Sequence, residues 1–223
     1  FLLILLSFNI SLKANSNDKA QILLKEGGKL IFIRHAIAPG GGDPVDFDIL
    51  RCETQRNLSK EGITQSKNIG KFFSENNIQI DKVLSSEWCR CKQTAKYAFN
   101  RYETISFLNS FFSAKFASNK NKQIYDLKKY INEWNGDNNL VLVTHYVTIQ
   151  EVLNISPSSG EIIISDKNFD VPHNGIFYDT SLAEYWFALP ELPDFTFDTI
   201  NVLLIADSEA YETDSFQFLD TTY

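Results

Sequence analysis

Apolar and polar positions along residues 29–165 fall into two alternating patterns. Short apolar runs predict four strands: KLIFIRH (29–35), DKVLSS (81–86), NLVLVTH (139–145) and GEIIIS (160–165). Between and after these runs, apolar residues at helical spacing predict helices over about 59–76, 87–99, 119–135 and 147–153. Because strands and helices alternate, we expect an α/β fold: a three-layer sandwich with a mostly parallel central sheet flanked by helices.

Polar side chains stand where three of these strands end. Arg34 and His35 close the first strand, His145 closes the third, and Arg90 lies in the first turn of the helix after the second. The carboxyl ends of parallel strands share one edge of a sheet, so we expect these side chains to meet there. Two imidazoles and two guanidiniums suit a phosphoryl group, because guanidinium forks pair with phosphate oxygens and a helix N-terminus adds partial positive charge.

Four short motifs surround these residues in the order FIRHA, RNLSKEG, VLSSEWCRCKQTA and LVTH. Together, over about residues 29–165, they resemble the histidine phosphatase superfamily, also called phosphoglycerate mutase-like, and in particular its small secreted bacterial branch. The resemblance implies a phosphoglycerate mutase-like fold. It also implies a nucleophilic histidine in the first motif, here His35, which takes the phosphoryl group as a phosphohistidine that water then hydrolyses.

The resemblance implies roles for the other pocket residues as well. Arg34 and Arg90 match phosphate-binding arginines, His145 matches the second histidine of the phosphate pocket, and Arg56 falls near an arginine present in some members. A neutral imidazole is a competent nucleophile when a hydrogen bond holds its other nitrogen. No metal or cofactor is expected, because a dense cationic pocket catalyses phosphoryl transfer by positioning and charge.

The sequence departs from the family pattern at the residue that protonates the leaving group. Where many members have a glutamate, the segment FLNSFF offers Asn109 and Ser110. Where others have an aspartate after the second histidine, this chain has Tyr146, and the usual glycine after the first histidine is Ala36. Without the usual acid, substrates with good leaving groups or phosphohistidine substrates are favoured.

Three acidic residues are candidates for the missing proton donor. Glu87 is nearest in sequence to the phosphate-binding helix, although a carboxylate there also complements the helix dipole. Asp43 and Asp46 lie in the loop after the first strand, and the sequence does not decide among the three. The loop APGGGDP (38–44) forms either a flexible connection or an anion-binding nest of backbone amides, and it lacks the lysine and spacing of a nucleotide P-loop.

The three cysteines favour a disulfide over a metal site. Cys89 and Cys91 are two positions apart on a helix, so they point to nearly opposite sides and do not easily share one tetrahedral ion. Cys52 either pairs with one of them or remains, like them, a free thiol. A bridge would tie the segment CETQRNLS to the phosphate-binding helix.

The apolar N-terminus bears on location. Residues 1–16, FLLILLSFNISLKANS, resemble a truncated secretion signal, although a terminal strand or helix packed on the core also fits this pattern. The stretch is too short for a stable membrane span. We therefore expect an exported protein, in the periplasm or the extracellular space.

Charge divides the rest of the chain. All 21 Lys and Arg residues lie in residues 1–167, whereas residues 168–223 hold 11 of the 28 acidic residues. This asymmetry predicts a boundary near Lys167, so that the region resembling histidine phosphatases is a domain over 17–167. Residues 168–223 are then an acidic C-terminal segment of unassigned role, which includes His173 as a surface residue. The net charge of -7 argues against nucleic acid or an anionic membrane as a partner.

The sequence thus predicts a metal-independent phosphatase that hydrolyses a small phosphomonoester or a phosphohistidine, with His35 as nucleophile. It leaves the natural substrate and the oligomeric state open. A phosphoglycerate mutase-like phosphotransferase is an alternative, disfavoured by the missing acid and the export signal. A catalytically silent phosphate- or phosphoprotein-binding module, which keeps the cationic pocket, is an alternative from another class.

Overall fold

A mixed six-stranded sheet forms the centre of the part of the chain that the structure describes, in the order β3-β2-β4-β1-β5-β6. The structure is a computed structural model that describes residues 16–172 and 175–177. The neighbouring pairs β1–β4, β4–β2 and β2–β3 are parallel, whereas β5 is antiparallel to both β1 and β6. The strands are β1 Leu30–Arg34, β2 Ile80–Ser85, β3 Glu103–Thr104, β4 Asn139–Thr144, β5 Ile162–Ser165 and β6 Ile176–Phe177.

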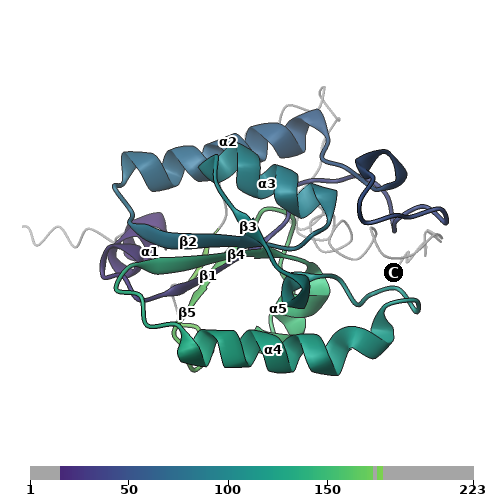
Figure 1. The fold of residues 1–223 in the computed structure, drawn as a ribbon. Coiled ribbons are helices and arrows are strands. Elements are labelled where there is room, and N and C mark those ends of the chain that lie inside the picture. Colours follow the sequence, from purple (N-terminus) through teal and green to yellow (C-terminus); the bar gives the residue numbers. More distant parts are fainter. Residues whose placement is uncertain (1–15, 173–174, 178–223) are drawn as a thin grey trace, which may run out of the picture.

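Helices flank the sheet on both faces (Figure 1). In this view α2 and α3 lie above the sheet, and α4 and α5 lie below it. The α/β class predicted from the alternating pattern is therefore confirmed. The helices are α1 Ser16–Lys25, α2 Lys60–Glu75, α3 Cys89–Phe99, α4 Lys120–Glu133 and α5 Tyr146–Leu153.

The alternation of side chains along β1 explains why both faces of the sheet are apolar. Ile31 and Ile33 point into the core shared with α1 and α2, whereas Leu30 and Phe32 point into the core shared with α4, where they meet Leu127. All four strand residues are fully buried. A strand covered on both faces reads as a continuous apolar run, which is the pattern that predicted it.

The start of α2 is set by a cap and a close contact. Ser59 Oγ accepts a hydrogen bond from the Gly62 backbone N–H at 3.1 Å, as its position before the apolar stripe predicts. The Ile37 carbonyl accepts from the Ser59 N–H at 3.0 Å, and a Cβ at position 62 would collide with that same carbonyl. Glycine at position 62 therefore lets the chain that leaves β1 lie directly on the first turn of α2.

Outside the alternating region, the structure adds elements that the sequence did not predict. Helix α1 begins at Ser16 and buries Ala20 and Leu24 in the core. Strand β6 pairs with β5, so the sheet includes residues beyond Lys167. The expectations for residues 1–15, for His173 and for residues 178–223 lie outside the described residues. Over the described ranges, no helix has the length and apolar character needed to cross a membrane.

Candidate active site

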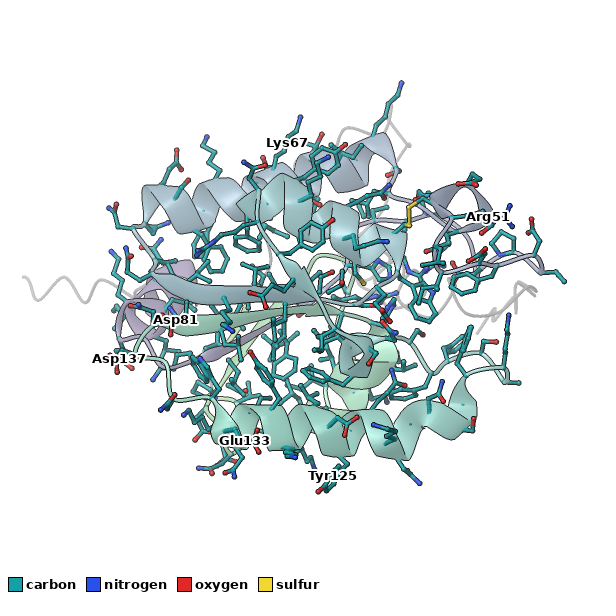
Figure 2. The ribbon with its side chains drawn as sticks, in the orientation of Figure 1. Arg51, Lys67, Asp81, Tyr125, Glu133 and Asp137 are labelled. Atoms are coloured by element: carbon teal, nitrogen blue, oxygen red, sulfur yellow. A yellow bond between two sulfur atoms is a disulfide. The ribbon has the colours of Figure 1, made fainter. Side chains whose placement is uncertain are left out.

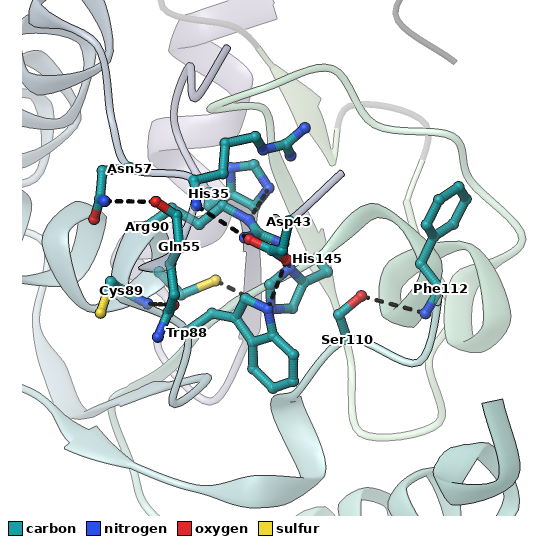
Figure 3. A network of polar contacts seen from close by, with 12 residues as sticks. His35, Asp43, Gln55, Asn57, Trp88, Cys89, Arg90, Ser110, Phe112 and His145 are labelled. Atoms are coloured by element: carbon teal, nitrogen blue, oxygen red, sulfur yellow. Dashed lines mark hydrogen bonds and ion pairs between the residues drawn. The ribbon is translucent and has the colours of Figure 1, made fainter. Parts of the chain in front are cut away.

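The side chains predicted to meet at one sheet edge do so. Arg34 is the last residue of β1 and His35 follows it, while His145 directly follows β4, the parallel neighbour of β1. Ser86 directly follows β2, the other neighbour of β4, and leads into α3 with Arg90 in its first turn. Figure 3 shows His35, Arg90 and His145 converging at this edge.

His35 presents an unprotonated nitrogen to the pocket. Its side chain is 3% exposed, and its Nδ1 lies 2.9 Å from the Ala36 carbonyl oxygen, which only accepts, so Nδ1 carries the proton. Arg90 Nε donates to His35 Nε2 at 3.1 Å, which requires a lone pair on Nε2. Burial, followed by the positive charge of Arg90, holds the pKa of His35 well below its usual range. The imidazole is therefore neutral at neutral pH.

Arg90 contacts three other side chains of the pocket. Besides the bond to His35, its Nη1 lies 2.7 Å from Asp43 Oδ1 in an ion pair, and its Nη2 lies 3.4 Å from His145 Nδ1. The side chain is only 6% exposed. One guanidinium thus connects the first-strand histidine, the second histidine and a carboxylate from the loop.

His145 is held in the complementary tautomer by a chain of hydrogen bonds. Because Arg90 donates to Nδ1, the proton lies on Nε2, which donates to Ser86 Oγ at 2.9 Å. Ser86 Oγ in turn donates to Asn109 Oδ1 at 3.1 Å. Burial, and then the charge of Arg90, lowers the pKa of His145 well below its usual range, so this imidazole is also neutral.

Arg34 and Arg56 complete the positive cluster. Arg34 Nη1 donates to the Pro157 carbonyl at 2.8 Å, and its guanidinium lies 5.4 Å from the centre of the Tyr146 ring. Burial, with the nearby charge of Arg90, lowers the pKa of Arg56 to about 10, so Arg56 remains protonated at neutral pH. Several guanidiniums close enough to repel each other make a site that an anion stabilises.

The candidate acids occupy different positions. Asp43 reaches the pocket and pairs with Arg90, whereas Asp46 is exposed. Glu87 Oε2 accepts a hydrogen bond from Asn109 Nδ2 at 2.5 Å, and Asn109 Oδ1 accepts from the Glu87 backbone N–H at 2.9 Å. In the sequence, Asn109 stands out only as the replacement of an expected glutamate. The structure shows that Asn109 links Glu87 to the Ser86–His145 chain.

A disulfide joins the loop after β1 to the start of helix α3. Cys52 pairs with Cys89, with their Cα atoms 5.6 Å apart, and Cys91 remains a buried free thiol. Beside the bridge, Gln55 Oε1 accepts from the Cys89 backbone N–H at 2.9 Å. Burial raises the pKa of Cys91 to about 12, so this thiol stays protonated and unreactive.

Two hollows lie at opposite ends of the sheet. One, about 400 Å³, is lined by Asp81, Trp134 and Asp137, where β2 and β4 begin (Figure 2), and its lining contains no histidine. The second, about 340 Å³, is lined by Trp88 and Asn109 and so lies beside the histidine pocket. Within residues 16–172 and 175–177, no three His, Cys, Asp or Glu side chains cluster as metal ligands.

The fold and the site define an α/β protein with two neutral histidines and a cluster of arginines at the carboxyl edge of its sheet. No family model and no curated protein matches the sequence. Among solved structures, the chain is similar to the protein histidine phosphatase SixA complexed with tungstate, at 16% identity and a TM-score of 0.49 over 69% of this chain and 99% of that one.

Two further solved structures show similarity of the same order. The mycobacterial glucosyl-3-phosphoglycerate phosphatase in complex with VO₃ matches at 14% identity and a TM-score of 0.43, over 61% of this chain and 91% of that one. Phosphoglycerate mutase from Thermus thermophilus matches at 13% identity and a TM-score of 0.41, over 62% and 92%.

Proposed function

We propose that this protein is a phosphatase of the histidine phosphatase type that hydrolyses a small phosphomonoester or phosphohistidine through a covalent intermediate on His35. The observation that carries this proposal is the neutral His35 imidazole, whose Nε2 lone pair lies 3.1 Å from Arg90 Nε inside a cluster of guanidiniums. A nucleophile that is uncharged and surrounded by cations suits attack on a dianion.

The reaction takes two displacements at phosphorus. His35 Nε2 forms a bond to phosphorus as the bond to the leaving oxygen breaks, and that oxygen takes a proton. Water then attacks the phosphohistidine, loses a proton, and breaks the phosphorus–nitrogen bond to release inorganic phosphate. Arg90, Arg34 and Arg56 supply charge for the phosphoryl oxygens in both transition states, and the Ala36 carbonyl holds the Nδ1 proton of His35.

The hollow beside Trp88 supports a substrate with an organic part. It adjoins the pocket through Trp88 and Asn109 and offers about 340 Å³ lined by both aromatic and polar side chains. An anion no larger than inorganic phosphate would leave this space unused.

We also propose that the protein is exported and belongs to the small secreted branch that its motifs resemble. The Cys52–Cys89 disulfide supports an oxidising compartment, because such bridges are rare in the cytosol of mesophiles. The apolar stretch at residues 1–16 supports the same location.

Release of nitrophenol from 4-nitrophenyl phosphate, with and without a chelator, tests the proposed activity. We expect chelator-resistant turnover in the wild type and less than about a thousandth of that rate in His35→Ala, since the nucleophile is lost. Acid quenching during turnover should trap an acid-labile phosphoryl group on the wild type and none on the variant. A folded wild-type protein that binds phosphate without turnover, and loses that binding in Arg90→Ala, would instead be a phosphate-binding module.

A further inference from the structure

The carboxylate of Asp43 and the proposed nucleophile, His35, contact the same Arg90 guanidinium. Arg90 Nε contacts His35 Nε2 at 3.1 Å, and Nη1 of the same guanidinium contacts Asp43 Oδ1 at 2.7 Å. Asp43 is therefore bound to the guanidinium that also contacts His35. A phosphoryl group bound for attack by His35 would lie against this same guanidinium. Figure 3 shows Asp43 in the same network of contacts as Arg90 and His145.

Two further donors hold this carboxylate independently of Arg90. Trp88 Nε1 donates to Asp43 Oδ2 at 3.0 Å, and the Arg56 backbone N–H donates to Oδ1 at 3.2 Å. When a phosphoryl group takes over the Arg90 guanidinium, these two neutral donors remain. The Cys52–Cys89 bridge joins the segments that carry them. Asp43 would thus stay at the pocket and face the substrate.

The other candidate acids are less well placed. Asp46 is exposed in the same loop. The Glu87 carboxylate accepts a hydrogen bond from Asn109 Nδ2 at 2.5 Å. Among the described residues, no ion pair joins Glu87 to an arginine of the pocket.

We infer that Asp43 is the proton donor to the leaving group, an inference that rests on the proposed phosphatase activity. The substrate enters as a monoanion, and its proton passes to the Asp43 carboxylate as the phosphoryl oxygens take over the Arg90 guanidinium. As His35 Nε2 forms its bond to phosphorus, the Asp43 proton moves to the departing oxygen. In the second step the Asp43 carboxylate takes a proton from the attacking water, which restores the carboxylic acid for exchange with solvent.

A series of substituted phenyl phosphates, from 4-nitrophenyl to unsubstituted phenyl, tests this assignment in the full chain. The more basic the leaving group, the more the reaction needs an acid, so kcat should depend weakly on leaving-group basicity in the wild type and steeply in Asp43→Asn. We expect the kcat of Asp43→Asn to fall by about 100-fold or more with phenyl phosphate and by less than about 5-fold with 4-nitrophenyl phosphate. Asp46→Asn, the same substitution in the same loop, should keep the wild-type slope.

The possible outcomes separate the two proposals. The assignment would be overturned if Asp43→Asn lost kcat equally on all substrates. It would also be overturned if the kcat of the wild type depended steeply on leaving-group basicity. A gain in kcat/KM would overturn it too, because Asp43 would then be a carboxylate that blocks the phosphate site. If kcat depended steeply on leaving-group basicity in Glu87→Gln and not in Asp43→Asn, Glu87 would be the proton donor instead. Failure to trap a phosphohistidine from 4-nitrophenyl phosphate on the wild type would refute the proposed function itself.

Discussion

At the scale of single residues, the pocket depends on two histidines that the fold keeps uncharged. Both side chains are 3% exposed, and burial beside Arg90 lowers the pKa of each well below its usual range. The neutral form leaves a lone pair on Nε2 of His35, and at His145 it donates from Nε2 to Ser86 Oγ. The unfolded chain exposes the same imidazoles to water, where they take up protons at higher pH.

This difference predicts that stability decreases with acidification between pH 7 and pH 5. A histidine whose pKa is lower in the folded state stabilises the fold fully above the unfolded pKa, and this contribution is lost as pH falls below it. The free energy of unfolding should decrease by up to about 1.4 kcal/mol per pH unit for each of the two histidines. Urea titrations at several pH values measure the slope.

The variant His35→Asn removes the contribution of one of the two buried imidazoles to the pH dependence of the free energy of unfolding. It should reduce the dependence on pH by about half, whatever its effect on stability at pH 7. A free energy of unfolding that does not change between pH 7 and pH 5 would show that the buried histidines are not held neutral.

At the scale of elements, the loop after β1 and the first turn of α3 act as one unit. The Cys52–Cys89 bridge, the Gln55 contact to the Cys89 N–H, and the Asp43 contacts to Trp88 and Arg90 all join them. Strand β1 and helix α3 could each be predicted from local pattern, because apolar periodicity is a property of neighbouring residues. Their connection could not, since it is made by residues more than 30 positions apart.

We expect Cys52→Ser to destabilise the protein substantially. The bridge spans a sequence separation of 37 residues, and removing it restores chain entropy to the unfolded state, which corresponds to roughly 4 kcal/mol. Thermal unfolding with and without dithiothreitol measures the loss. Dithiothreitol should lower the melting temperature of the wild type and leave that of Cys52→Ser unchanged, and an equal response of both proteins would contradict a role for the bridge.

At the scale of the whole molecule, the sheet extends beyond the boundary that charge predicts. Past Lys167, the Phe169 ring lies 6.4 Å from the ring of Phe32 in the core, and β6 adds a strand to β5. Lys167 Nζ also contacts the Trp134 carbonyl oxygen, so the chain around this position is packed on the domain. The change in charge near Lys167 therefore does not coincide with the end of the packed sheet.

Two C-terminal truncations test whether the residues after Lys167 stabilise the domain. A chain ending at residue 167 should be less stable than one ending at residue 177 by about 1 to 3 kcal/mol, because it lacks the partly buried Phe169 and Val171 and the β6 pairing. Chemical denaturation of the two proteins gives the difference. Equal midpoints would place the stability boundary at residue 167, as the charge pattern predicts.

The sequence by itself determined the alternating elements and the side chains at their ends, because periodicity and strand-end position are local properties. His35, Arg90 and His145 therefore met where they were expected, and Arg34 ends β1 directly before His35. Only the tertiary structure decided that Cys52 pairs with Cys89 and that Asp43 reaches Arg90. Both depend on the path of a glycine-containing loop, which no periodicity specifies, and on distances between residues far apart in the chain.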